Sequence, residues 1–227
     1  TDTKKLDFNK SIELKNITFK FDDRKKLLEN LNLKIEKNNI IGIYGDSGSG
    51  KSTLLNIFCL LIKPQNGEIL IDENKIADNN QIRKYQNLIS FISQDTFLLD
   101  DTIKNNILFG SEKEFDDKKM NDALKFSQVD IFLKDFPKGI ETMIGNNSRK
   151  ISSGQKQRIV IARSFYDSRE ILVLDEATNA LDEETEKKII QNIINKKDDK
   201  TIIIVSHNKS NLSVCDKNYV IEDGKIT

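Results

Sequence analysis

The segment from Gly45 to Thr53 reads G-D-S-G-S-G-K-S-T, which matches the spacing G-x-x-x-x-G-K-[ST]. An apolar run over residues 39–44 precedes it, and a helix-like apolar run over residues 54–58 follows it. Where a strand leads through a glycine-rich loop into a helix, backbone N–H groups and the helix N-terminus together bind phosphate. The segment therefore predicts a phosphate-binding loop within an α/β fold of the P-loop NTPase type.

The loop residues have separate expected roles on a nucleoside triphosphate. The loop backbone surrounds the phosphate oxygens, Lys51 reaches the β- and γ-phosphates, and Ser52 offers its hydroxyl to Mg²⁺. An ordinary Gly/Ser turn before a helix is the alternative, and it is disfavoured because both the spacing and the flanking pattern fit the motif. The nucleotide-binding residues predicted here are Gly45, Asp46, Ser47, Gly48, Ser49, Gly50, Lys51, Ser52 and Thr53.

The composition narrows the class of protein. The chain has 227 residues and equal numbers, 36 each, of basic and acidic residues, so its zero net charge argues against a nucleic-acid binder. No signal peptide is visible in the sequence, and no apolar run approaches the roughly 18 residues of a membrane span. Cys59 and Cys215 lie in apolar segments of helical pattern, where we expect packed, reduced thiols rather than a disulfide or metal site.

Two kinds of strand pattern divide the chain. Alternating apolar and polar residues, which predict a half-solvated antiparallel subsheet, occur over residues 11–21, 31–35 and 67–72. Residues 171–174 and 202–205 are continuously apolar, as in parallel strands covered on both faces. A helix is predicted between them over 183–194, followed by a charged, solvated turn over 196–200.

The middle of the chain is mostly helical in pattern over residues 96–167, with a break marked by Pro137 and Gly139. We therefore expect one domain over residues 1–227. Its β subdomain and catalytic core would cover about 10–95 and 168–227, and a helical subdomain would cover about 96–167.

Polar residues follow the predicted strands at their carboxyl ends, where an α/β nucleotide site places its ligands. Asp175 and Glu176 follow one strand; Asp175 would hold Mg²⁺ through water, and Glu176 would orient the attacking water or accept its proton. His207 and Gln94 end two further strands, where His207 would reach the same phosphate and Gln94 would ligate Mg²⁺ or position water. Without the phosphate loop in the same chain, the ordinary interpretation would be a solvated acidic pair, a surface histidine and a glutamine with no particular role.

Residues 151–158 open a helix that runs to about Tyr166. Ser152 and Gln155 fit an S-x-x-Q capping box, so a purely structural account is available. The functional alternative uses the same geometry, because an exposed helix N-terminus with a serine hydroxyl and the Gly154 amide is a second anion site. Since the loop helix already holds the phosphates, this second site would serve a nucleotide bound by another molecule.

The order of these motifs resembles that of the nucleotide-binding domain of an ATP-binding cassette (ABC) transporter, over essentially the full chain. The matching motifs are the phosphate loop 45–53, the glutamine loop at Gln94, the signature 151–155, the acidic strand 171–176, the D-loop 179–182 and the switch His207. The resemblance implies a RecA-like core with a helical signature subdomain. It also implies that Phe21 stacks on adenine and that Asp182 of the D-loop contributes to the nucleotide site.

The resemblance further implies a head-to-tail homodimer that encloses two Mg-ATP. The residues that would face the γ-phosphate bound by the other protomer are Ser152, Ser153, Gly154 and Gln155. The implied Mg²⁺ ligands are Ser52, Gln94 and Asp175. Glu176 would polarise the attacking water and His207 would hold the γ-phosphate, so these two are the implied catalytic residues.

Two positions depart from the family pattern. Ser153 replaces the first glycine of the usual Leu-Ser-Gly-Gly-Gln, which adds a Cβ where backbone approaches phosphate. Asn146 stands where the exporter loop usually has a glutamate, which bears on an ion pair to the membrane part. Residues 94–107 resemble exporters and flippases of lipids, lipid-linked oligosaccharides or peptides. We therefore expect a transmembrane domain as partner, normally in the same polypeptide, with the ATPase at the cytoplasmic membrane face.

Three rival classes fit less well. A GTPase-type switch is suggested by Asn208 to Asn211, yet the aspartate that reads guanine is missing. A non-transport ABC protein acting on DNA or the ribosome usually needs tandem cassettes, a coiled-coil insertion or a basic surface, so no nucleic-acid partner is expected. A kinase is disfavoured because nothing resembles a phosphoacceptor lid.

Overall fold

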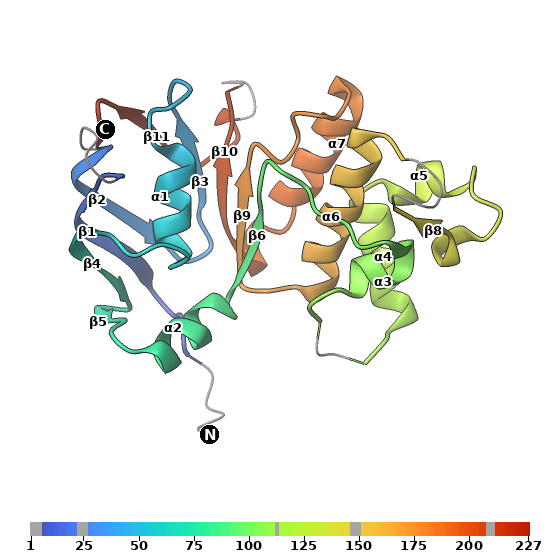
Figure 1. The fold of residues 1–227 in the computed structure, drawn as a ribbon, viewed down its shortest axis with the longest axis horizontal. Helices are drawn as coiled ribbons and strands as arrows, with labels where there is room; N and C mark the ends of the chain where they lie inside the picture. Colours follow the sequence, from blue (N-terminus) through green and yellow to red (C-terminus); the bar gives the residue numbers. More distant parts are fainter. Residues whose placement is uncertain (1–5, 22–26, 112–113, 146–150, 208–211) are drawn as a thin grey trace. The chain divides into compact units, whose positions relative to one another are not determined.

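The computed structural model describes residues 6–21, 27–111, 114–145, 151–207 and 212–227. They belong to two compact units, drawn in Figure 1. Unit 1 combines Thr1–Phe91, Glu170–Asp175 and Lys197–Thr227, and unit 2 combines Ile92–Arg169 and Glu176–Lys196. Each unit has a hydrophobic core of its own.

Unit 1 contains a four-stranded antiparallel sheet in the order β2-β1-β4-β5. The strands are β1 (Ser11–Phe19), β2 (Leu28–Glu36), β4 (Asn66–Ile71) and β5 (Asn74–Lys75). Leu31, Leu33 and Ile35 of β2 are buried while the residues between them are exposed, as the alternating pattern predicts. The predicted antiparallel subsheet is confirmed, although β1 ends at Phe19, two residues before the expected end.

The second sheet of unit 1 has the order β12-β11-β3-β10-β9-β6 (Figure 1). Its strands are β3 (Ile40–Tyr44), β6 (Ile89–Ile92), β9 (Ile171–Asp175), β10 (Thr201–Val205), β11 (Lys217–Glu222) and β12 (Lys225–Ile226). The four strands β11, β3, β10 and β9 pair in parallel. Every residue of β9 and β10 is buried, which is why their sequences are continuously apolar. The predicted parallel sheet is confirmed.

Among the described residues of unit 1, two α-helices precede β6. The helix α1 (Lys51–Phe58) contributes Leu54, Ile57 and Phe58 to the core that it shares with both sheets. The helix α2 (Asn79–Gln86) begins at a capping box between Asp78 and Gln81, two residues that lie three apart in the sequence.

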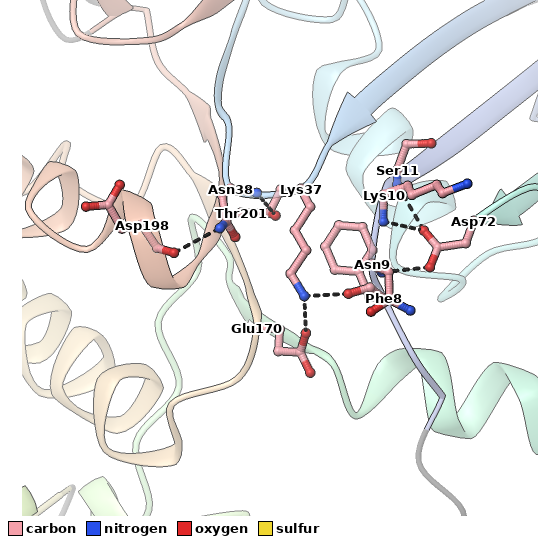
Figure 2. A network of polar contacts seen from close by, with 10 residues as sticks. All are labelled: Phe8, Asn9, Lys10, Ser11, Lys37, Asn38, Asp72, Glu170, Asp198 and Thr201. Carbon is pink, nitrogen blue, oxygen red and sulfur yellow. Dashed lines mark hydrogen bonds and ion pairs between the residues drawn. The ribbon is translucent and has the colours of Figure 1, made fainter.

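A polar network anchors the segment that leads into β1 (Figure 2). The Asp72 carboxylate accepts three backbone hydrogen bonds, at 2.6, 2.7 and 3.0 Å, from the N–H groups of Asn9, Lys10 and Ser11. Burial alone would raise the pKa of Asp72, but these donors outweigh it and hold the pKa below its ordinary value. Lys37 donates to the carbonyl of Phe8 and pairs with Glu170 at 3.5 Å, so this end of unit 1 is fixed by charge as well as by packing.

Unit 2 is mainly helical. Its elements are β7 (Asp101–Thr102), α3 (Ile103–Leu108), α4 (Asp117–Phe126), α5 (Val129–Leu133), the 3-10 turn η1 (Gly139–Glu141), β8 (Met143–Ile144), α6 (Ser153–Asp167) and α7 (Glu183–Ile194). The core lies among α3, α4, α5 and α6, and Phe126 stacks on Phe165 with ring centroids 3.9 Å apart. The small antiparallel pair β7–β8 lies within the stretch predicted as mostly helical.

The remaining sequence expectations concern α7, the turn after it and the two cysteines. The bounds of α7 are those predicted, and the charged turn after it contains the 3-10 turn η2 (Lys197–Asp199). Both cysteines were expected in helical segments, but neither lies within a helix: Cys59 follows α1 and Cys215 follows a turn. Both thiols are free, and burial, with a smaller contribution from the charge of Asp175, raises the pKa of Cys59 to about 12.

Candidate nucleotide-binding and hydrolysis site

The phosphate-binding loop connects β3 to α1 in unit 1, as the sequence predicts. Gly45 must lack a side chain, because a Cβ there would lie 2.5 Å from the carbonyl oxygen of Ile221 in β11. Gly50 has a φ of 104°, a left-handed conformation that glycine adopts at no steric cost. The glycines of the motif therefore allow a tight loop to be packed between two parallel strands and a helix.

Lys51 has only 6% of its surface exposed, and its ammonium group is turned into the loop. Its Nζ donates to the carbonyl oxygens of Gly45, at 2.7 Å, and Asp46, at 2.9 Å. Gly50, the N-cap residue of α1, has no side chain to cap the helix, and the first N–H groups of an α-helix have no partner within the helix. Within the described part of the chain, the buried Oγ of Ser49 also lacks a hydrogen-bond partner. A buried cation, an uncapped helix N-terminus and a spare hydroxyl together fit a phosphate group.

A cavity of about 430 Å³ borders this loop within unit 1. Its lining residues are Leu27, Asp46, Ser47, Gly48, Ser49, Ile221, Glu222, Asp223 and Gly224. The sequence reasoning missed the contribution of residues 221–224, because β11 has a single buried residue and so a weak periodic signal. A turn signal, the Asp-Gly pair at 223–224, was available there.

The strand register of unit 1 brings several predicted residues to one edge of the sheet. Val205 lies opposite Ile43 of β3 on one side and opposite Asp175 of β9 on the other. The loop that starts at Gly45, the carboxylate of Asp175 and the exposed His207 therefore leave parallel strands at the same end. Asp175 is 4% exposed, so it is a buried acidic group at the end of its strand.

Phe21 lies two residues beyond β1 and is 47% exposed. Its ring meets that of Phe19 edge-to-face, with centroids 4.8 Å apart. The side-chain amide of Gln65 bonds to both backbone groups of Lys20, accepting from its N–H at 2.9 Å and donating to its carbonyl at 2.8 Å. The backbone before Phe21 is thus held in place while the ring itself remains accessible.

Glu176 belongs to unit 2 and is 8% exposed. Its φ of 51° is unusual for a residue with a side chain. Its Oε2 accepts a hydrogen bond from Asn179 Nδ2 at 2.8 Å, a partner that the sequence reasoning did not identify. Asp182 caps α7 by accepting from the N–H of Thr185 at 3.0 Å, and this bond, with one from the Thr185 hydroxyl, lowers the pKa of Asp182.

The predicted capping box at the start of α6 is confirmed. Ser152 Oγ accepts from the N–H of Gln155 at 3.2 Å, and Gln155 Oε1 accepts from the N–H of Ser152 at 3.0 Å. Ser152 and Ser153 are both exposed at this helix N-terminus. The extra side chain of Ser153 is thus accommodated on the surface of unit 2 without loss of the cap.

The predicted site residues divide between the two units. Unit 1 holds the loop, Phe21, Asp175 and His207, whereas unit 2 holds Gln94, Glu176, the signature residues and Asp182. Gln94 is exposed and lies two residues beyond β6. Two further sequence positions, Asn146 and the segment 208–211, lie outside the described residues.

The predicted Mg²⁺ ligands Ser52, Gln94 and Asp175 would supply a hydroxyl, an amide and a carboxylate oxygen. In the ranges that the structure describes, no group of three or more His, Cys, Asp or Glu residues is placed to hold a metal. The described helices also include none that is long and apolar enough to cross a membrane.

Comparison with known proteins identifies the class to which this fold and site belong. A family model described as ABC transporter matches residues 28–179, which is more than half of the chain. The chain belongs to the ABC transporter family and is an ABC transporter ATPase domain.

Among its relatives, an ATP-dependent lipid A-core flippase of Photobacterium profundum is 33% identical over 219 residues, covering 96% of this chain and 37% of the flippase. A multidrug resistance ABC transporter ATP-binding and permease protein of Lactococcus lactis is 34% identical over 218 residues, with 96% and 37% covered. The solved structure of a bacterial Atm1-family ABC exporter with ATP bound has a TM-score of 0.92 and 30% identity, covering 100% of this chain and 40% of that one. The chain thus spans about two fifths or less of the length of these proteins.

Proposed function

We propose that the chain is the ATP-driven motor of an exporter or lipid flippase, joined to a transmembrane domain and placed at the cytoplasmic face of a membrane. The arrangement of Lys51 is the observation that carries this proposal. A buried ammonium group that bonds to two loop carbonyls, beside a helix N-terminus whose N-cap is a glycine, is a site suited to phosphate. The relatives that cover 96–100% of this chain are named as a lipid A-core flippase, a multidrug resistance transporter and an exporter, which favours transport over the alternative of a DNA- or ribosome-associated ATPase.

In this proposal, unit 1 binds the nucleotide. Lys51 moves from the carbonyls of Gly45 and Asp46 to the β- and γ-phosphates, and the loop N–H groups bind the remaining oxygens. The exposed ring of Phe21 stacks on adenine, and the backbone bonds that Gln65 makes to Lys20 reduce the ordering required for stacking. The cavity beside the loop leaves room for the nucleoside.

Hydrolysis requires the residues of unit 2 as well. Glu176 orients the attacking water and accepts its proton, while Asn179 holds the Glu176 carboxylate in place. His207 donates to the γ-phosphate and stabilises the charge that develops on it. Mg²⁺, held by Ser52, Gln94 and Asp175, would supply positive charge to the phosphates.

Two copies of the chain would close head to tail around two ATP molecules. The start of α6, where Ser152 and Ser153 are exposed, would meet the γ-phosphate bound by the other copy. These contacts exist only with ATP present, so ATP binding stabilises the dimer and hydrolysis releases it. The membrane part would convert this closing and opening into movement of a substrate.

The test uses Glu176→Gln, with Glu184→Gln as a matched control on the exposed face of α7. Loss of a general base reduces turnover by about 10²- to 10⁴-fold. We expect Glu176→Gln to bind ATP like the parent chain, to lose turnover on that scale, and to elute as a longer-lived dimer in size-exclusion chromatography with Mg-ATP. The control should match the parent chain in all three measurements.

Turnover by Glu176→Gln at the rate of the parent chain would refute the assignment of the base. A variant that binds ATP but elutes as a monomer at every concentration tested would refute the proposed dimer.

A further inference from the structure

We propose that Gln157 is a positioning residue for ATP hydrolysis, which ties the signature end of α6 to the turn that carries Glu176. The inference rests on the role proposed above for Glu176. It concerns contacts within unit 2 only, which joins residues 92–169 with residues 176–196.

Gln157 is a buried amide, with 4% of its surface exposed, in the second turn of α6. Its Oε1 accepts a hydrogen bond from the backbone N–H of Ala180 at 3.1 Å. Polar side chains are rarely buried without such a partner, and losing one leaves the other group unsatisfied. The helix that presents Ser152 and Gln155 is therefore bonded directly to the turn after Glu176.

A second contact between α6 and the turn involves the carbonyl group of the same residue, Ala180. A Cβ at Gly154 would lie 2.9 Å from the carbonyl oxygen of Ala180, so the two backbones are already in close contact there. Of the two glycine positions in the family signature, this chain keeps Gly154 and replaces the other with the exposed Ser153. The contact explains the difference, because a side chain at 154 would collide with the turn whereas one at 153 projects to the surface.

The turn continues the connection to Glu176. Asn179, the neighbour of Ala180, donates from its Nδ2 to Glu176 Oε2 at 2.8 Å and from its backbone N–H to the Glu176 carbonyl at 3.3 Å. Leu181 donates to the carbonyl of Thr178 at 3.0 Å, which closes the turn. Glu176 itself has a positive φ of 51°, a conformation that persists only where the surroundings impose it.

The contacts form a short path from α6 through Gln157, Ala180 and Asn179 to the Glu176 carboxylate. Losing the Gln157 bond would free the turn and let the carboxylate adopt orientations that cannot activate water. The affinity of one chain for ATP would stay nearly unchanged, because Lys51 and the other loop residues proposed to bind the phosphates belong to unit 1. A merely structural bond would instead lower stability and leave the turnover of the folded chain alone.

The test compares Gln157→Leu, Gln157→Glu and the control Gln191→Leu, which makes the same replacement on the exposed face of α7. We expect Gln157→Leu to lower kcat by roughly tenfold, as for one lost buried hydrogen bond, with the KM for ATP within about twofold of the parent value. Gln157→Glu keeps an acceptor oxygen and should retain a kcat closer to that of the parent chain. Urea unfolding establishes that each variant is folded at the assay temperature.

A double-mutant cycle with Glu176→Gln decides whether the effect passes through the base. If it does, Gln157→Leu lowers kcat roughly tenfold in the parent chain but less than about twofold in Glu176→Gln. Equal losses in both backgrounds, equal kcat losses in Gln157→Leu and Gln157→Glu, or a normal kcat in Gln157→Leu would each overturn the inference. Unimpaired turnover in Glu176→Gln alone would instead contradict the proposed function on which the inference rests.

Discussion

Replacement of Gly45 by alanine should damage both the stability of unit 1 and its phosphate site. The added Cβ would lie 2.5 Å from the carbonyl oxygen of Ile221 and 2.7 Å from Oγ of Ser49. The first contact is about 0.9 Å short of the 3.4 Å at which ordinary contact begins. The clash involves backbone of β11, which pairs in parallel with β3, so side-chain rotation cannot relieve it. Overpacking of this kind costs about 1–3 kcal/mol.

Gly48 provides a matched control in the same loop. A Cβ there meets nothing within 4 Å, although the φ of 80° gives alanine a conformational penalty of about 1–2 kcal/mol. Urea unfolding should therefore rank the parent chain first, Gly48→Ala second and Gly45→Ala last. Displacement of the backbone at Gly45 also moves the loop N–H groups that are proposed to bind phosphate, so Gly45→Ala should weaken ATP binding by at least about tenfold in a fluorescent-nucleotide titration.

The comparison refutes the reasoning if Gly45→Ala unfolds at the same urea concentration as the parent chain. An unchanged ATP affinity in a folded Gly45→Ala would also refute it, because the loop would then tolerate movement at its first residue.

Two further predictions concern unit 1. Phe21→Ala should weaken ATP binding by about 1–3 kcal/mol, the range for a base stacked on an aromatic ring. It should lower the free energy of unfolding by about 0.5–1.5 kcal/mol, because the half-exposed ring meets Phe19 edge-to-face. Phe21→Tyr should match the parent chain in the same nucleotide titration, and equal affinities for all three would contradict stacking. Asp72→Asn should lower stability at pH 7 by roughly 1–2 kcal/mol, since three N–H donors lose a charged acceptor that is partly screened by solvent. The pKa of Asp72 is depressed in the folded chain, so its stabilisation is present above the ordinary carboxyl pKa of about 4 and is lost as the pH falls below that value. Urea unfolding from pH 7 to 3 should therefore bring the unfolding free energies of the variant and the parent chain together. A difference that stays constant over this pH range would argue against the role of Asp72.

The sequence predicted the buried framework well, for identifiable physical reasons. Strands covered on both faces need continuous apolar residues, so β9 and β10 could be recognised from residues 171–174 and 202–205. The capping box of α6 depends on residues three apart, so Ser152 and Gln155 were sufficient to predict it.

Features that depend on long-range contacts or on few buried residues were not predictable. β11 has a single buried residue, Ile221, so its sequence has no apolar periodicity by which the strand could be recognised. The carbonyl oxygen of Ile221 nevertheless requires glycine at position 45. The anchor of Asp72 joins it to backbone more than 60 residues away, and backbone N–H groups leave no trace in a sequence. The bond between Gln157 and Ala180 spans 23 residues and uses a backbone donor, so the motifs alone gave no reason to single out Gln157.

The division of the site at a single peptide bond has a consequence for mechanism. Asp175 is the last residue of β9 in unit 1, and Glu176, the next residue, belongs to unit 2 and is bonded to its turn. The loop residues proposed to bind the phosphates and the residue proposed to activate water therefore belong to different units. Substitutions within the unit 2 turn should then affect kcat, and substitutions in the unit 1 loop should affect ATP affinity. Gln157 and Gly45 test the two sides of this division, because neither side chain is itself proposed to touch the reacting atoms.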